Sequence, residues 1–159
     1  MARTTPDTPP TVRFYQAAGG EFFQLIARLA TKAVERGLRL FIVAANPEHA
    51  QLLDQHLWCH PENSFLPHGL ESEPNPELQP ILIGTTPNDQ NGATVLIVAN
   101  SLPLSNPGQF DLVVDFAFAS NLDPRNHLAS RQRYSHYRNL GCTMEYWVQS
   151  PAGGWEKKI

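Results

Sequence analysis

The segment LRLFIVAA, residues 38–45, constrains the fold of this chain more than any other, because it is apolar almost throughout. Such a run is typical of a strand that is buried on both faces of a sheet, since a strand with one solvated face alternates apolar and polar residues. Before it, residues 21–37 place apolar side chains at helical spacing and end at a glycine. After it, Asn46 as N-cap and Pro47 in the first turn open a second helix that runs to about Trp58. A buried strand between two helices predicts an α/β fold.

The rest of the chain repeats this alternation. Residues 12–16 and 143–150 alternate apolar and polar side chains and are predicted as the first and last strands. A helix is expected from about Asn126 to Leu140, ending at a glycine. Three short apolar runs are predicted as further strands, at residues 80–86, 94–100 and 112–118. Together these patterns predict a three-layer α/β/α, Rossmann-like fold with a mostly parallel central sheet, although three successive strands leave room for some antiparallel pairing.

Length and composition indicate one domain. The chain has 159 residues, and we expect a loose Pro- and Thr-rich leader at 1–11, a single domain at 12–150 and a tail at 151–159. No signal peptide and no apolar stretch of about 20 residues is visible. Two cysteines, Cys59 and Cys142, are too few for a secreted disulfide framework. The sequence therefore predicts a cytoplasmic protein without a membrane segment.

The turn after the first predicted strand does not have the sequence of a phosphate-binding loop. Residues 16–20 end in two glycines but contain neither G-x-G-x-x-G nor a GK[ST] ending. The chain also lacks a G-x-S-x-G elbow. Asp111 and Asp115 flank a strand and could form a carboxylate pair, but neither a base nor a nucleophile accompanies them. We therefore predict no catalytic site.

The most metal-like spacing in the chain is His56, Cys59 and His60. A structural zinc site needs four ligands, and no second pair of cysteines is present. Pro61 also argues against a helical His60. We interpret the two histidines as ordinary surface residues and Cys59 as a small packing residue, and we predict no metal and no cofactor.

Charge is segregated along the sequence. Between Arg39 and Arg125 the chain has no Lys or Arg but carries ten of its fifteen acidic residues. Four arginines then follow, one just before the last predicted helix and three within it, with no acid from Asn126 to Met144. This pattern predicts a basic patch that attracts an anionic partner; the alternative is a solvated helix face. The net charge of −3 argues against general binding of duplex DNA.

Two segments have the composition of protein-binding surfaces. In the first, large apolar groups occupy a helix end and the loop after it, which either anchor a partner or cover the sheet edge. Its residues are Trp58, Phe65, Leu66, Pro67 and His68. In the second, Arg131, Tyr134 and Arg138 recur at i, i+3 and i+7, so they share one face of the last predicted helix. Two guanidinium groups beside an aromatic ring suit an acidic ligand with an aromatic group, such as a peptide tail that ends in a carboxylate; the alternative is a basic helix whose tyrosines pack inward.

The order of five segments resembles the chi subunit family of bacterial DNA polymerase III, from Arg13 to about Val148. The segments are FYQ, LIARLATKAVERGLRLFIVAANPEHAQLLDQHLW, SFLPHGL, FDLVVDF and SRQRYSHYRNLG. The resemblance implies an accessory subunit of the clamp-loader complex without catalytic activity. It also implies two partners, the psi subunit and the acidic C-terminal tail of single-stranded-DNA-binding protein, so that DNA is contacted indirectly.

The resemblance also implies roles for particular residues. Arg131, Tyr134 and Arg138 match the tail-binding helix of the family, whereas His127 and Ser135 stand where the family often has lysines. The Trp58 segment matches the family's partner surface, with which a helicase-like protein is also associated. The sequence does not choose between the psi subunit and the helicase-like protein.

Two other classes of function stay open from the residues alone. One is a nucleotide-binding α/β enzyme with a degenerate phosphate loop. The other is a direct binder of single-stranded DNA that stacks bases on Tyr134 and Tyr137.

Overall fold

The computed structural model describes residues 9–17, 22–59, 66–99, 109–118, 124–152 and 154–158. In this part of the chain the strands are β1 (Thr11–Ala17), β2 (Leu40–Val43), β3 (Gly69–Leu70), β4 (Ile81–Gly84), β5 (Val95–Val98), β6 (Leu112–Phe118), β7 (Thr143–Gln149) and β8 (Trp155–Lys157). The helices are α1 (Phe22–Glu35), α2 (Pro47–Cys59) and α3 (Pro124–Asn139), with a short 3-10 helix, η2, at Pro76–Leu78.

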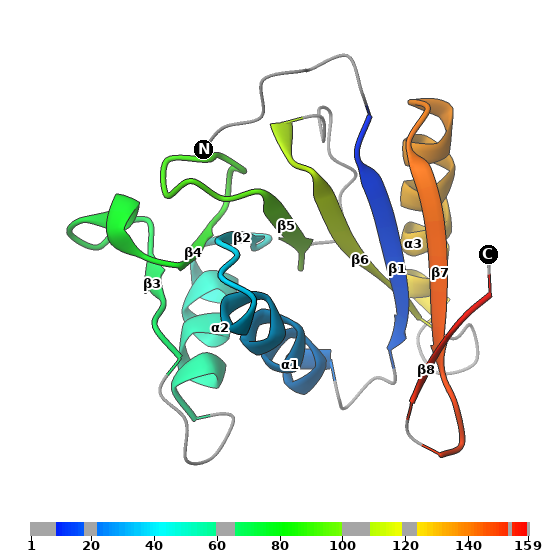
Figure 1. Cartoon of the computed structure of the whole chain (residues 1–159), viewed down its shortest axis with the longest axis horizontal. Coiled ribbons are helices and arrows are strands. Elements are labelled where there is room, and N and C mark those ends of the chain that lie inside the picture. Colours follow the sequence, from blue (N-terminus) through cyan, green and yellow to red (C-terminus); the bar gives the residue numbers. More distant parts are fainter. Residues whose placement is uncertain are drawn as a thin grey trace.

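The strands form one sheet in the order β3-β4-β2-β5-β6-β1-β7-β8 (Figure 1). Neighbouring strands run parallel, except that β7 and β8 are antiparallel. The mostly parallel sheet that the sequence predicts is therefore confirmed. The possible antiparallel pairing among the middle strands does not occur, because β4 and β5 both pair parallel to β2, and β6 pairs parallel to β5.

Helices cover the sheet on both faces, which gives the three expected layers (Figure 1). Successive residues of β1 point to opposite faces of the sheet and join different cores. Tyr15 packs on the face of α1 and α2, and Phe14 packs on the face of α3. All four residues of β2 are buried, as a strand between two helical layers requires. Where α3 does not reach, the loop residues Ala93 and Phe110 complete the second core.

Local signals place the helix ends where the sequence predicts them. The Oδ1 atom of Asn46 accepts a hydrogen bond from the backbone N–H of His49 at 2.8 Å, which caps α2. Gly37 and Gly141 follow α1 and α3 with φ angles of 77° and 85°, in the left-handed region that glycine adopts without strain. No helix in the described ranges is both long and apolar enough to cross a membrane.

The C-terminal segment differs from the expected tail. Trp155–Lys157 forms β8 and pairs with β7, because the Trp155 ring packs edge-on against Tyr15 with ring centroids 5.0 Å apart. The short strand β3 and the 3-10 helix were also not predicted, since they lie in a proline-rich stretch without periodicity. Most of the expected leader and both glycines of the predicted first turn lie outside the described residues.

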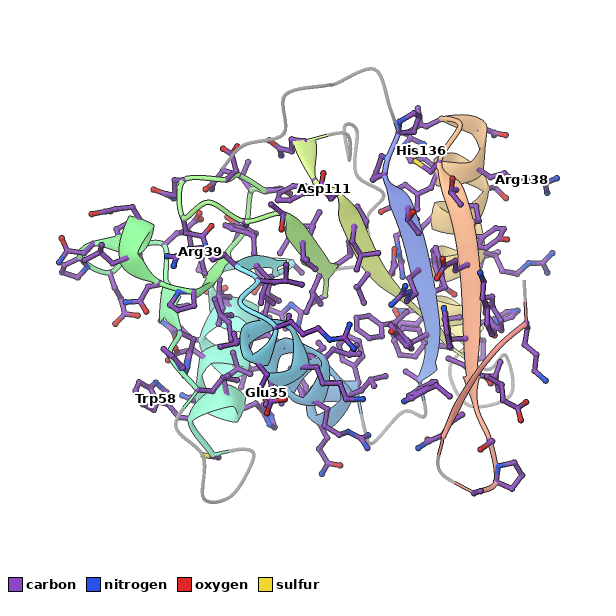
Figure 2. The ribbon with its side chains drawn as sticks, in the orientation of Figure 1. Glu35, Arg39, Trp58, Asp111, His136 and Arg138 are labelled. Atoms are coloured by element: carbon purple, nitrogen blue, oxygen red, sulfur yellow. The ribbon has the colours of Figure 1, made fainter. Side chains whose placement is uncertain are left out.

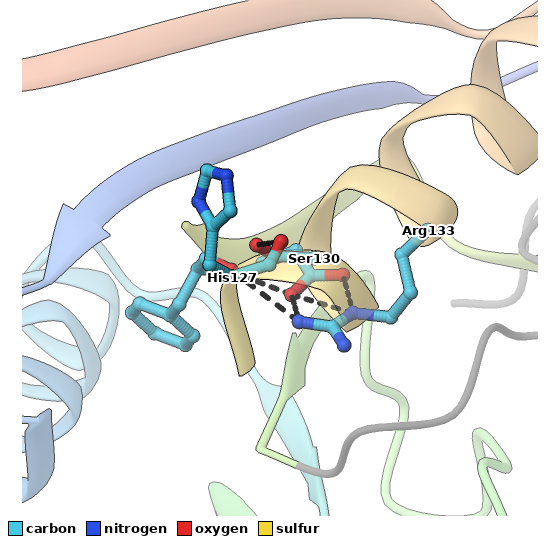
Figure 3. A network of polar contacts seen from close by, with 5 residues as sticks. His127, Ser130 and Arg133 are labelled. Carbon is cyan, nitrogen blue, oxygen red and sulfur yellow. Dashed lines mark hydrogen bonds and ion pairs between the residues drawn. The ribbon is translucent and has the colours of Figure 1, made fainter. Parts of the chain in front are cut away.

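A buried ion pair joins α3 to the middle of the sheet. Asp115 in β6 has no exposed surface and Arg133 is 2% exposed. The Arg133 side chain donates to both carboxylate oxygens, with Nε 2.9 Å from Oδ2 and Nη2 3.0 Å from Oδ1 (Figure 3). The burial raises the pKa of Asp115, and the Arg133 charge and hydrogen bonds oppose this rise. Arg133 is therefore not part of the expected surface patch, and Asp115 does not form a carboxylate pair with the exposed Asp111.

We expect Arg133→Ala to lower the free energy of unfolding by about 3–5 kcal/mol, because it leaves a buried carboxylate without its counter-charge. Without Arg133 the pKa of Asp115 in the folded state lies further above its unfolded value. The loss of unfolding free energy in Arg133→Ala is therefore largest near neutral pH. It shrinks as the pH falls and Asp115 takes up a proton. Urea unfolding at about pH 7 and about pH 5 measures both effects.

The matched control is Arg138→Ala, since Arg138 is an exposed arginine on the same helix. We expect this variant to change the free energy of unfolding by no more than about 0.5 kcal/mol. Similar losses in the two variants would contradict a special role for the buried pair.

Candidate functional site

The outer face of α3 carries a shallow depression with a cationic side. α3 turns Ser130, Arg133 and Tyr137 toward the sheet, and Arg131, Gln132 and Ser135 between them are exposed. Figure 2 shows Arg138 on this helix, pointing away from the sheet. The depression is lined by Leu128, Arg131, Gln132, Ser135, His136 and Asn139.

The structure brings together only two of the five residues that the sequence assigned to this helix surface. Arg131 and Ser135 line the depression. Arg138 is exposed beside it. Tyr134 is half-buried, with its ring centroid 5.3 Å from that of Phe14. It therefore belongs partly to the core.

His127 is anchored as well. Its Nδ1 atom lies 2.7 Å from the carbonyl oxygen of Phe118, and its backbone carbonyl accepts a hydrogen bond from Ser130 Oγ at 2.9 Å (Figure 3). This ring holds the start of α3 against β6. His127 lies on the same edge of the helix as Tyr134, outside the depression.

Four of the described residues that line the depression are not among those that the sequence assigned to this surface: Leu128, Gln132, His136 and Asn139. Leu128 is 58% exposed and is its apolar wall. Leu128, Gln132, His136 and Asn139 recur at spacings of three and four residues, so helical periodicity could have grouped them on one face.

The charge of this face is positive and unbalanced. Arg125, Arg131 and Arg138 are exposed on α3. Among the described residues no ion pair joins Arg131 or Arg138 to an acid. The nearby Asp115 is already neutralised by Arg133. The face can therefore bind an anionic group without first breaking an internal ion pair.

Tyr137 does not belong to the surface. Its side chain is fully buried, 6.3 Å from Phe14 between ring centroids. The predicted stacking of a nucleic-acid base on Tyr137 is therefore wrong. Of the two tyrosines that the direct-binding hypothesis needs, only Tyr134 is partly exposed.

The second candidate surface lies at the end of α2. Trp58, at the end of α2 (Figure 2), is 57% exposed. Its ring packs against that of His68 at a tilt of 57°, with centroids 4.7 Å apart. Leu66 and His68 are each only 6% exposed, and Pro67 is half-buried. Phe65 lies outside the described residues. Trp58 is thus the exposed anchor of this surface, and the buried residues support it.

Hydrogen bonds hold the His68 ring on both sides. Its Nδ1 atom lies 2.7 Å from the carbonyl oxygen of Leu66, and its Nε2 atom lies 3.1 Å from the carboxylate of Asp54. Burial and the nearby Glu73 raise the pKa of Asp54, and the bonds from His68 and Trp58 oppose this rise. The ring therefore fixes the loop under Trp58.

No metal site is found in the described ranges, where no group of three or more His, Cys, Asp or Glu side chains could hold an ion. His56 stacks on Phe23 with centroids 4.2 Å apart, and Cys59 is exposed. His60, the third member of the metal-like spacing, lies outside the described residues.

We expect Trp58→Ala to change the free energy of unfolding by less than about 1 kcal/mol, because most of this side chain is already in water. We expect His68→Ala to cost about 2–3 kcal/mol, because it removes a buried ring and leaves Asp54 without its main partner. Urea unfolding of the two variants measures the difference. A larger loss in Trp58→Ala than in His68→Ala would place Trp58 in the core.

Comparison with known proteins places the chain in one family. The family model described as "DNA polymerase III chi subunit, HolC" matches residues 10–145, a range that contains Trp58 and all of α3. The DNA polymerase III subunit chi of Escherichia coli (strain K12) is 29% identical over 122 residues, which cover 76% of this chain and 81% of that protein. Its counterpart in Pseudomonas aeruginosa is 28% identical over 125 residues, 77% of this chain and 82% of that protein. The probable subunit chi of Rickettsia prowazekii is 29% identical over 84 residues, 53% of this chain and about half (51%) of that protein.

Proposed function

Because the chain belongs to the DNA polymerase III chi subunit family, we propose that it links the clamp loader of that polymerase to single-stranded-DNA-binding protein. In this proposal a psi-type subunit binds the Trp58 surface, and the acidic C-terminal tail of single-stranded-DNA-binding protein binds α3. The chain acts as an accessory subunit without catalytic activity and contacts DNA only through that protein. The observation that carries the proposal is the family match across residues 10–145, which includes both candidate surfaces.

The chemistry of α3 supports the tail as its ligand. Arg131 offers a guanidinium for charge-assisted hydrogen bonds to carboxylates, and Arg138 adds a second exposed positive charge. Leu128, in the depression beside Arg131, gives an apolar group of the ligand a surface to pack on. A peptide that is both acidic and apolar at its end therefore matches this face.

The geometry of the second surface supports a protein partner. An exposed tryptophan over a rigid buried ring provides a large apolar contact whose position is already fixed, and tryptophan is enriched among the residues that dominate binding energy. A helicase-like partner would use the same surface and would compete with the psi subunit.

We expect a short acidic peptide that ends in Phe with a free carboxylate to bind α3, and Arg131→Ala to weaken this binding about 10- to 150-fold. The reason is that a hydrogen bond to a charged group contributes roughly 1.5–3 kcal/mol. Amidation of the C-terminus should weaken binding about as much as the loss of one arginine, because it removes the matching charge. Calorimetry on the peptide, on its amidated form and on the variant measures these effects.

The matched control is Arg28→Ala, since Arg28 is an exposed arginine on α1 rather than α3. This variant should bind the peptide like the parent protein. Affinity should also fall with added salt, because the attraction is mainly between charges. Equal affinity of the free and amidated peptides for the parent and Arg131→Ala would show that the arginines are only a solvated face.

For the second surface, we expect Trp58→Ala to weaken binding of the psi subunit about 30- to 1000-fold, the effect of losing a central interface aromatic. Phe65→Ala should have the same effect, and calorimetry with the psi subunit of the same bacterium measures both. Leu52→Ala is the matched control, because Leu52 is 49% exposed on the same helix. Unchanged binding by a folded Trp58→Ala would place the psi subunit elsewhere.

A further inference from the structure

A cavity of about 240 Å³ lies between α1 and the strands β1, β7 and β8, on the face of the sheet opposite α3. It exists because the helices of this face do not extend over the C-terminal hairpin. Trp147 and Trp155 from this hairpin are half-buried and form one wall. The cavity shares none of its lining residues with the depression on α3 or with the Trp58 surface.

The floor and the wall of the cavity are apolar. The floor comes from aliphatic side chains of β5 and β6, among them Ile97 and Val114. Tyr15 meets Trp155 edge-on, with ring centroids 5.0 Å apart, and so fixes the aromatic wall. An aromatic or aliphatic side chain that enters the cavity therefore meets apolar surface on two sides.

The rim of the cavity is cationic. Arg13, Lys32 and Arg36 line it, and no acidic residue among those that the structure describes does. The Arg13 guanidinium is already paired, because its Nε lies 2.8 Å from the Glu145 carboxylate. Lys32 and Arg36 are exposed on α1 and in the turn after it. These two charges are the ones that can attract a new anion.

The position of the cavity argues against a nucleotide. Ligands of open α/β sheets bind beyond the carboxyl ends of the strands, whereas this cavity lies over the body of β5 and β6 and includes their first residues, Val95 and Leu112. The part of α1 that lines it is the C-terminal half, whose helix dipole disfavours a phosphate. Anionic groups must therefore be held by side chains at the rim, not by backbone N–H groups.

The size of the cavity indicates an anchor side chain. Pockets that enclose a drug-sized ligand measure about 300–1,000 Å³, more than this cavity provides. One large apolar side chain fits, and the chain that carries it can pass over the rim. We propose that this cavity is a second peptide site, which takes an apolar anchor residue from an acidic segment of a partner protein.

This site is independent of the proposed function of α3. The α3 surface is expected to need the free carboxylate at the end of a peptide, whereas the cavity needs only an internal apolar residue between acids. A peptide blocked at both ends therefore distinguishes the two sites.

The probe is a nine-residue peptide with eight acidic residues around one central Phe, acetylated and amidated at its ends. We expect it to bind the full-length protein in calorimetry, and the indole N–H signals of Trp147 and Trp155 to shift in NMR spectra while that of Trp58 stays. The double variant Lys32→Glu, Arg36→Glu should weaken binding at least tenfold, because it reverses the charge of the rim. Ala33→Phe should also weaken it, because Ala33 lines the cavity and a larger ring fills it.

Arg28→Glu is the matched control, since Arg28 is exposed on α1 but does not line the cavity; it should bind within about twofold of the parent. Peptides with Ser in place of Phe, or with Gln in place of the acids, should bind at least tenfold more weakly. The proposal is overturned if the blocked peptide does not bind, or if Arg28→Glu weakens binding as much as the double variant. It is also overturned if Arg131→Ala abolishes binding, or if a ten-nucleotide single-stranded DNA shifts the same indole signals at lower concentration than the peptide does.

Discussion

The buried pair of Asp115 and Arg133 determines how α3 lies on the sheet. The cost of removing two charges from water is offset only when they form a well-aligned ion pair and their remaining polar atoms are hydrogen-bonded. Here the guanidinium donates to both carboxylate oxygens and also to the carbonyl of Phe116. This arrangement fixes the rotation of the helix about its axis, so that Tyr137 points inward and Arg131 points outward. The basic outer face thus follows from an ion pair on the inner face.

The distribution of the helices over the sheet determines where binding surface remains. α3 covers β6 and β7 on one face, whereas α2 packs on the opposite face, near β3 and β4. No helix of the described ranges covers the α1 side of the C-terminal hairpin, and Arg13, Trp147 and Trp155 are consequently left half-buried there. A half-buried aromatic or cationic side chain can still contact a ligand, whereas a fully packed side chain cannot.

The three surfaces of this chain lie on different elements. The depression belongs to α3, Trp58 lies at the end of α2, and the cavity lies beside α1 on the face opposite α3. Ligands at separate surfaces do not exclude one another. This property suits a protein proposed to join two components of a larger assembly, because the link requires that both partners be bound at once.

The sequence by itself determined the strands other than β3 and β8, the helix ends and the family resemblance, and tertiary structure decided the roles of most side chains. Buried strands and helix caps such as Asn46 can be predicted because their signals, an apolar run and a capping side chain, lie within a few consecutive residues. The packing of Trp155 in β8 against Tyr15 and the burial of Arg133 depend on partners far along the chain. The bracing role of His68 depends on Asp54 in the preceding helix. α3 in particular has few apolar residues, so its sequence does not mark an inner face. Only contact with Asp115 decides which of its arginines is buried and which meet solvent, since a charge is buried only where its partner is already in place.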